Sequence, residues 1–162
     1  MPIKIKALSL HQPWASLVAI GAKKYETRSW PTGYRGELLI CSTKDFKAAM
    51  QGWHSSSVIR NALSLRGFTD WRNLPFGQAI ALVYLEDCQS TIKLGELFEQ
   101  GRLKHFSRTN ELHYGNYDPG RFAWKLSNCR PIREPFPVRG RQGLFEVELP
   151  EDFEAMLGRS AR

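Results

Sequence analysis

The sequence lacks the features that would place a protein in a membrane or outside the cell. Its longest uninterrupted apolar run extends only from Ala79 to Leu85, whereas a membrane-spanning helix needs about 20 apolar residues. No basic segment followed by an apolar one opens the chain, so no export signal is expected. We therefore predict a cytoplasmic protein that does not insert into membranes.

Cysteine and histidine are too sparse and too scattered for the sites they usually build. Cys41, Cys88 and Cys129 form neither a CxxC pair nor an even set for disulfides. The four histidines show no HxxxH or HExxH spacing. The chain also has no P-loop, no GxGxxG after a strand and no GxSxG elbow. We expect no metal site and no cofactor.

Positive charge, in contrast, is abundant and unevenly placed. The 162 residues contain 23 Lys and Arg against 16 Asp and Glu, a formal net charge of +7. Residues 102–141 hold nine of the cations and three of the acids, which is +6 of that total. Such an excess favours a polyanionic partner, although a basic surface that only promotes solubility would have the same composition.

A chain of this length and composition predicts one domain, residues 1–162, with a sizeable core. Apolar periodicity predicts strands at 3–10, 25–28, 38–41, 78–85, 122–126 and 144–149, and helices at 13–20, 92–100 and 151–157, with a weaker helix near 58–65. Ser42 and Thr43 offer a cap for another helix, with Asp45 in its first turn. The elements show no regular βαβ alternation, which favours an α+β fold with a mostly antiparallel, barrel-like sheet flanked by short helices.

One segment, Gly21 to Arg28, concentrates charged side chains directly after a predicted helix. Alternate residues of a strand share a face, so Glu26 and Arg28 are expected to project together. In a purely structural interpretation, Lys23 or Lys24 caps the helix end and Glu26 pairs with Arg28 or Lys23. In a functional one, the guanidinium fork and the carboxylate bind a phosphate or a base edge. Both interpretations fit the residues.

Several blocks of the chain resemble the ASCH domain family, whose hallmark is a GxKxxExR signature. The signature lies at Gly21 to Arg28, and the other matching blocks are LSLHQPWA at 8–15, YRGELLI at 34–40, GQAIALV at 77–83, FAW at 122–124 and RGRQGLF at 139–145. The resemblance implies a PUA-like β-barrel with a cleft for RNA or another nucleic acid. It also implies that Lys23, Glu26 and Arg28 line that cleft.

Some members of the family are hydrolases of N4-acetylated cytidine, and some are reported as ribonucleases. The deacetylating branch pairs its signature Lys with a Thr, where this chain has Glu26. Lys23 carries over from that branch, whereas the Thr does not. If the protein is an enzyme, the resemblance makes Lys23 and Glu26 the candidate catalytic residues.

Further candidate binding residues lie close to the signature and in the basic stretch. An amide and aromatic rings near the signature are suited to a base, and Arg35, just after a turn, is suited to a phosphate. The segment 106–121 mixes cations with rings, as single-stranded nucleic acid requires. The candidate set, beyond the three signature residues, is Gln12, Trp14, Trp30, Arg35, Arg108, Tyr114, Tyr117 and Arg121.

Two functions follow from these observations. The first is a binding module that takes single-stranded RNA, another single-stranded nucleic acid or a modified nucleobase. The alternative is a hydrolase, either a ribonuclease or an amidohydrolase acting on N4-acetylcytidine, in which Lys23 activates water and Glu26 moves a proton.

Overall fold

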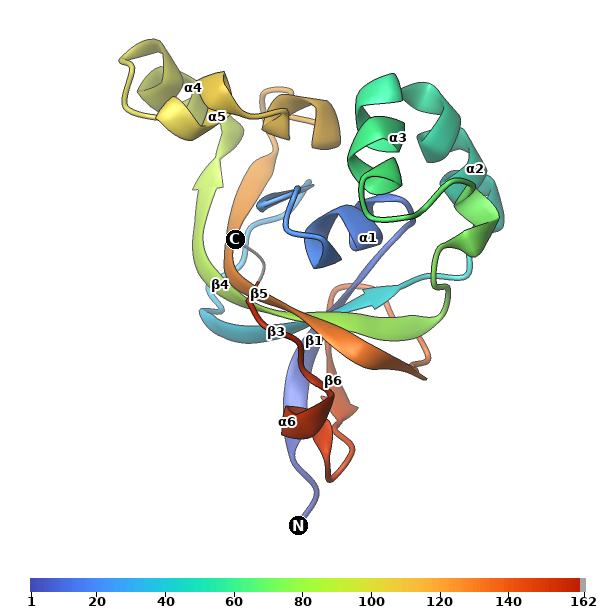
Figure 1. Ribbon diagram of the computed structural model, residues 1–162. Coiled ribbons are helices and arrows are strands. Elements are labelled where there is room, and N and C mark those ends of the chain that lie inside the picture. Colours follow the sequence, from blue (N-terminus) through green and yellow to red (C-terminus); the bar gives the residue numbers. More distant parts are fainter. Residues whose placement is uncertain (161–162) are drawn as a thin grey trace.

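A single mixed sheet organises the molecule. The structure is a computed structural model that describes residues 1–160, and within that range the sheet has six strands in the order β2-β5-β4-β3-β1-β6. Their bounds are Lys4–Leu10 (β1), Tyr25–Arg28 (β2), Gly36–Ser42 (β3), Gln78–Ser90 (β4), Phe122–Pro137 (β5) and Leu144–Glu148 (β6). β1 runs parallel to β3, and the other neighbours are antiparallel. The sheet curls into a half-barrel (Figure 1), which confirms the predicted α+β, PUA-like architecture.

Two strands are longer than the sequence predicts. β4 continues five residues past Leu85, and β5 unites the predicted strand at 122–126 with the proline-rich extended segment after it. The β4–β5 register shifts at three places, for example between Ala79 and Ala81. Such bulges bend a sheet, so the two long strands curl around the helices instead of forming a flat surface.

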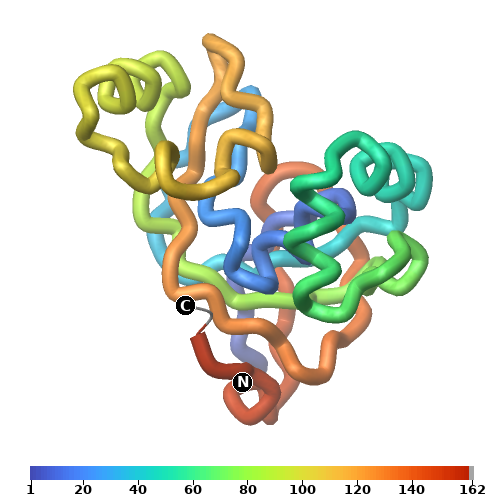
Figure 2. The backbone as a smooth tube through the Cα atoms, turned by 45° about the horizontal axis from the view of Figure 1, so that its top comes forward, coloured from blue at the N-terminus to red at the C-terminus, as the bar shows by residue number. Residues whose placement is uncertain are grey.

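Short helices cover the sheet in two lobes that rise on either side of α1 (Figures 1 and 2). One lobe holds α2 and α3, and the other, which we call the α4–α5 lobe, holds α4, α5 and the 3-10 helix η2. The bounds are Trp14–Ala19 (α1), Phe46–Ser55 (α2), Ser57–Ser64 (α3), Trp71–Asn73 (η1), Thr91–Glu99 (α4), Lys104–Arg108 (α5), Glu111–Tyr114 (η2) and Phe153–Met156 (α6). In the described residues, no helix has the length and apolarity of a membrane span.

The start of α2 differs from the prediction. Ser42 belongs to β3, and Asp45 instead caps the helix, because its Oδ1 accepts a hydrogen bond from the Ala48 N–H at 2.9 Å. Aspartate is a favoured N-cap residue because it satisfies a backbone donor that the first turn leaves free. The Thr43 hydroxyl does not cap the helix and contacts His11 instead, with 2.8 Å between His11 Nδ1 and Thr43 Oγ1.

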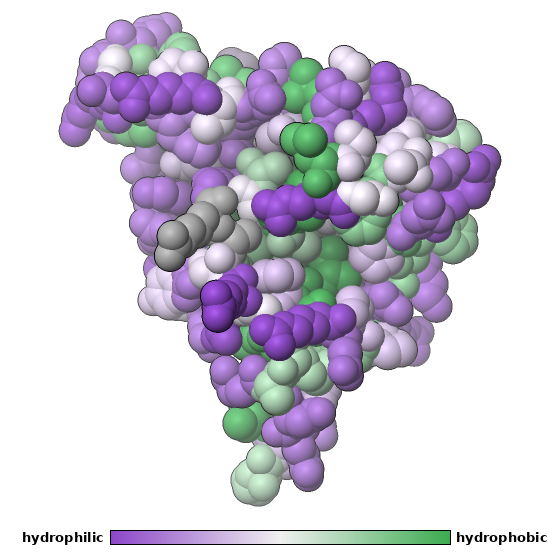
Figure 3. Space-filling view, viewed as in Figure 1, coloured by the Kyte–Doolittle hydropathy of each residue, from purple (hydrophilic) through white to green (hydrophobic). Residues whose placement is uncertain are grey.

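The core is divided between the two faces of the sheet. α1 packs onto one face through a cluster that includes Val18, Ile40 and the fully buried Trp124. The other face is covered by α6 and the chain after it. Two smaller clusters hold the lobes, one around Trp53 and Leu63, the other around Tyr25 and Phe106. Each lobe is therefore anchored by its own apolar contacts. Hydrophilic residues cover most of the face in Figure 3, and hydrophobic residues gather in its central hollow.

Candidate nucleic-acid site

The signature segment begins where α1 ends. Gly21 has a φ of 81°, a left-handed conformation that glycine adopts without steric cost. The N–H groups of Ala22 and Lys23 then both donate to the Leu17 carbonyl at 3.0 Å. Because backbone donors close the helix, the Lys23 side chain is not needed as a cap. Of the two lysines expected as a cap, Lys23 instead donates to the Tyr114 carbonyl, whereas the expected pairing of Glu26 with Arg28 or Lys23 is confirmed.

The three signature side chains instead form a chain of alternating charges. Lys23 Nζ lies 3.6 Å from Glu26 Oε1, and Glu26 Oε2 lies 3.5 Å from Arg28 Nη2. Lys23 is 2% exposed and Glu26 9%. As the sequence predicts, Glu26 and Arg28 share a face of β2. Two charges this deeply buried are tolerated only when they are paired and hydrogen-bonded, so the cluster must be held in place from several sides.

Those additional contacts come from distant parts of the chain. Lys23 Nζ donates to the Tyr114 carbonyl at 2.8 Å, and the Thr27 N–H donates to Glu26 Oε1 at 2.9 Å. Arg28 Nη2 donates to the Ser9 carbonyl at 2.8 Å. The cluster thus joins β2 to η2 on one side and to β1 on the other.

A pocket of about 560 Å³ opens beside this cluster, between the two lobes. Its wall comes from β1, α1, β2 with the following turn, the α2–α3 lobe and the segment after η2. The lining residues are Ser9, Leu10, His11, Trp14, Glu26, Thr27, Arg28, Ser29, Trp30, Ser55, Ile59, His113, Tyr114, Gly115, Asn116 and Arg121. A cavity of this size is typical of a small-molecule or nucleotide site.

Six of the residues singled out from the sequence line the pocket: Trp14, Glu26, Arg28, Trp30, Tyr114 and Arg121. Lys23 lies behind its wall. The other four predicted residues lie elsewhere. The fully buried Gln12 donates from Nε2 to the Pro75 carbonyl at 2.7 Å and accepts from the Ser16 N–H at 3.0 Å. The exposed Arg35 donates to the Thr32 and Tyr34 carbonyls, and Arg108 is exposed on α5.

The predicted stacking loop at 106–121 is instead a folded part of the α4–α5 lobe. Tyr114 is 4% exposed and belongs to the core of the α2–α3 lobe. The Tyr117 ring packs edge-on against Phe106, with 5.6 Å between ring centroids, and burial raises the pKa of its phenol. Tyr117 serves packing, whereas Tyr114 packs in the core and also lines the pocket. Trp14 and Trp30 line the pocket as well, the latter held edge-on by Trp124 at 4.7 Å.

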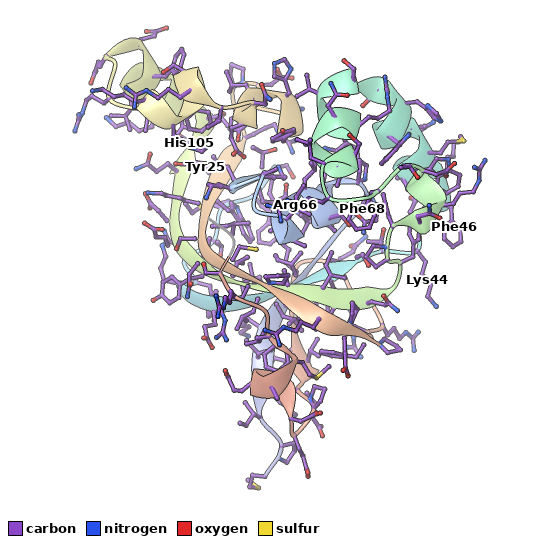
Figure 4. All side chains as sticks on the ribbon, in the orientation of Figure 1. Tyr25, Lys44, Phe46, Arg66, Phe68 and His105 are labelled. Carbon is purple, nitrogen blue, oxygen red and sulfur yellow. The ribbon has the colours of Figure 1, made fainter. Side chains whose placement is uncertain are left out.

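Sequence reasoning missed Glu111, which fastens η2 to β2. Its side chain is fully buried and accepts from the backbone N–H groups of Lys24, at 3.0 Å, and Tyr25, at 2.9 Å. His105 Nε2 lies 3.2 Å from its other oxygen, and Figure 4 shows His105 and Tyr25 close together where α5 meets β2. One signal was visible in the sequence, because Glu111 is one of only three acids in the basic stretch.

Gly115 lines the pocket and also contacts the buried Lys23–Glu26–Arg28 cluster. A Cβ on this residue would lie 3.2 Å from Thr27 Oγ1 and 3.4 Å from Lys23 Nζ. Both contacts are tight, so a larger residue would displace one of these groups. Because Gly115 has no side chain, the segment after η2 can lie directly against Lys23. This segment covers the Lys23 ammonium and still leaves it close to the pocket.

The charge at the pocket is positive. Arg28 and Arg121 line it with a single carboxylate, that of Glu26, and Lys23 lies immediately behind. Two buried polar atoms at the pocket, Ser9 Oγ and Arg28 Nε, have no partner among the described residues. Buried polar atoms normally have partners, so the protein leaves these two hydrogen-bonding groups unsatisfied at the edge of the pocket. Residues 1–160 contain no group of three or more His, Cys, Asp or Glu arranged to hold a metal ion.

The fold and the site define a PUA-like domain with a basic, tryptophan-lined pocket beside a Lys–Glu–Arg cluster. The model of the ASCH domain family matches residues 8–136, and the chain belongs to that family. It is 36% identical over 141 residues to activating signal cointegrator 1 of Homo sapiens, and 38% identical over 143 residues to the same protein of Mus musculus. The matches cover 87% of this chain but 22% of each relative.

A solved structure of an ASCH protein from Zymomonas mobilis has the same fold. The superposition gives a TM-score of 0.51 at 17% sequence identity and covers 95% of this chain and 96% of the other. At that identity the likeness supports the fold alone.

Proposed function

We propose that the protein binds single-stranded nucleic acid, RNA in particular, and holds one base in the pocket between the lobes. The observation that carries this proposal is that two arginines and two tryptophans, Arg28, Arg121, Trp14 and Trp30, line the same pocket. Proteins bind single strands by combining cations for phosphates with aromatic rings for bases. Membership of the ASCH family supports the same class of ligand.

Each group at the pocket has a role that its chemistry suggests. The Glu26 carboxylate accepts hydrogen bonds from an exocyclic amine, such as that of cytosine. Arg28 contributes a planar fork for a base edge or a phosphate, and its orientation is fixed by Ser9 and Glu26. Lys23 is covered, so it acts on the ligand only by positioning the Glu26 carboxylate.

A pair of arginine substitutions tests the proposal. Arg28→Gln should weaken binding of a short single-stranded RNA about tenfold, because a charged hydrogen-bonding group contributes about 1.5–3 kcal/mol. Arg35→Gln is the matched control, since it removes the same charge from an exposed arginine outside the pocket, and it should change affinity less than twofold. Fluorescence anisotropy at low salt measures both, and unfolding curves confirm that both variants fold. Equal losses, or no binding by the wild-type protein, would contradict the proposal.

A hydrolase is the second candidate, and one observation favours it. The Glu26 carboxylate lines the pocket with a buried ammonium 3.6 Å behind it, an arrangement in which the carboxylate can transfer a proton. Incubation with single-stranded RNA and with N4-acetylcytidine distinguishes the two candidates. Binding alone predicts no turnover of either compound. Turnover that is abolished by Glu26→Gln, with folding intact, would establish the hydrolase instead.

A further inference from the structure

A second pocket adjoins the first one on the other side of Ser9. It has a volume of about 520 Å³ and lies where the end of β3, the start of β4 and the β5–β6 connection meet. Its lining includes Lys44, Gly77 and the segment from Pro137 to Gln142. Figure 4 shows Lys44 at this end of the sheet, just before the chain enters α2.

Three cations, Lys44, Arg139 and Arg141, line this second pocket, and none of its lining residues is acidic. Within residues 1–160, none of the three has a carboxylate within ion-pair distance or a side-chain hydrogen bond to the protein. They are exposed, so their charges stay hydrated, and no acidic side chain of the pocket neutralises them. An anion is the ligand that such a pocket favours.

Lys44 is held at this pocket by packing. A Cβ on Gly77 would lie 2.5 Å from Lys44 Cε, and Gly77 has a φ of +65°. The aliphatic stem of Lys44 therefore lies across a backbone position that glycine alone accommodates easily. Because the stem packs on the protein, the ammonium group of Lys44 has fewer accessible positions. This cation is thus partly preorganised for an anion in the pocket.

The two pockets share one wall residue, Ser9. This residue lines both, and its buried hydroxyl has no partner among the described residues. On the second side, the β5–β6 connection lies directly against it, because a Cβ on Gly140 would lie 3.1 Å from Ser9 Oγ. Next to Ser9, the hydrogen bond between His11 and Thr43 joins a residue of the first pocket to one of the second.

We propose that the second pocket binds the phosphate that links the base in the first pocket to its neighbour. The ligand is then an oligonucleotide of at least two nucleotides, and a free nucleoside occupies only half of the site. This inference rests on the proposed function, since it needs a base in the first pocket. In this arrangement Lys44, Arg139 and Arg141 bind the phosphate. Glu26 and Arg28 bind the base, and Ser9 lies at the boundary between the two pockets.

The test compares the dinucleotide CpC with cytidine as competitors of a labelled single-stranded RNA. In the wild-type protein, CpC should bind about tenfold more tightly than cytidine, because a phosphate bound by arginine forms charge-assisted hydrogen bonds. The double variant Arg139→Gln/Arg141→Gln should lose that advantage and still bind cytidine normally. Its binding of a longer RNA should also depend less on salt, by about 0.7 in the log–log slope for each phosphate that the variant no longer binds.

A matched double variant, Arg66→Gln/Lys93→Gln, removes two positive charges that line neither pocket and should keep the preference for CpC. If the preference survives in the Arg139/Arg141 variant, or if both variants lose it equally, the phosphate site is wrong while the base pocket stands. If the wild-type protein binds neither cytidine nor RNA, the proposed function fails and the phosphate site fails with it.

Discussion

Two groups of charged side chains lie on either side of Ser9, and they differ in burial and in pairing. On the inner side, Lys23, Glu26 and Glu111 are buried, and every one of them has a partner within 3.6 Å. On the outer side, Arg139 and Arg141 are exposed and have no ion pair within the described residues. The inner charges hold the pocket wall in place, whereas the outer charges remain free to bind a ligand. Substitutions in the first group should therefore lower stability as well as affinity, and substitutions in the second group should lower affinity alone.

The largest effect should come from breaking the inner cluster at Lys23. Lys23→Met leaves the Tyr114 carbonyl without its donor and the buried Glu26 carboxylate with Arg28 as its one remaining ion-pair partner, which should lower the free energy of unfolding by about 3 kcal/mol, the lower end of the cost of breaking a buried ion pair. Chemical denaturation measures this loss. Adding Glu26→Gln removes the carboxylate that has lost its ammonium, and the partly exposed Arg28 keeps its hydrogen bond to the Ser9 carbonyl, so the double variant should recover part of the stability. A loss below about 1 kcal/mol for the single variant would show that this pair does not hold the wall.

Glu111→Ala should have the next largest effect, because it leaves the N–H groups of Lys24 and Tyr25 without an acceptor. Each buried donor without a partner costs about 1–3 kcal/mol. The substitution should also weaken RNA binding, since η2 would no longer hold the Tyr114 carbonyl against Lys23. Glu154→Ala, at an exposed carboxylate on α6, is the control and should leave both stability and binding unchanged. Similar effects from both substitutions would contradict the anchoring role.

High pH should destabilise the α4–α5 lobe by a smaller amount. Burial, with a further contribution from Glu111, raises the pKa of Tyr25 to about 12, and burial likewise raises the pKa of Tyr117. The folded state therefore binds these protons more tightly than the unfolded state, whose tyrosine pKa is about 10. Below pH 10 these two groups should leave the free energy of unfolding unchanged. Above pH 10 the free energy of unfolding should fall, by up to about 1.4 kcal/mol per pH unit for each of the two tyrosines.

Unfolding curves at several pH values between 9 and 11 check this prediction. Tyr25→Phe removes one of the two phenols and should make the decline with pH shallower, whereas Tyr84→Phe, at an exposed position, should not. A free energy of unfolding that stays constant over this range would show that the two phenols ionise in the folded state as readily as in the unfolded chain.

The smallest effect on stability should come from the outer charges. Arg139→Gln/Arg141→Gln should change the free energy of unfolding by less than about 0.5 kcal/mol, since exposed side chains without partners contribute little. The same variant should nevertheless lose the preference for a dinucleotide. A loss of stability comparable to that of Lys23→Met would erase the distinction between the two groups.

The features that could be predicted from the sequence are those that depend on residues close together in the chain. The strand at Tyr25–Arg28 and the shared face of Glu26 and Arg28 follow from an alternation of period two. The α+β class follows from the pattern of short strands. At 106–121, tyrosines between cations indicated a loop that binds single-stranded nucleic acid; the rings of Tyr114 and Tyr117 instead complete the cores of the two lobes, although Tyr114 and Arg121 also line the pocket.

Contacts between distant residues could not be predicted in this way. Glu111 binds the backbone of Lys24, 87 residues earlier in the chain, and Lys23 binds the Tyr114 carbonyl across 91 residues. The second pocket likewise combines Lys44 with the β5–β6 connection. Such pairings are decided by how the sheet curls, and local sequence patterns do not encode that curvature.

The most direct measurement of the central claim is to map single-stranded RNA on the protein by NMR. Backbone amide signals are followed while a short RNA is added to the isotope-labelled protein. The largest shifts are expected at Ser9, at Glu26 to Trp30 and at His113 to Asn116, which line the first pocket, and at Arg139 to Gln142 in the second. Shifts confined to a third pocket, which Arg133 and Arg159 line, would contradict the account.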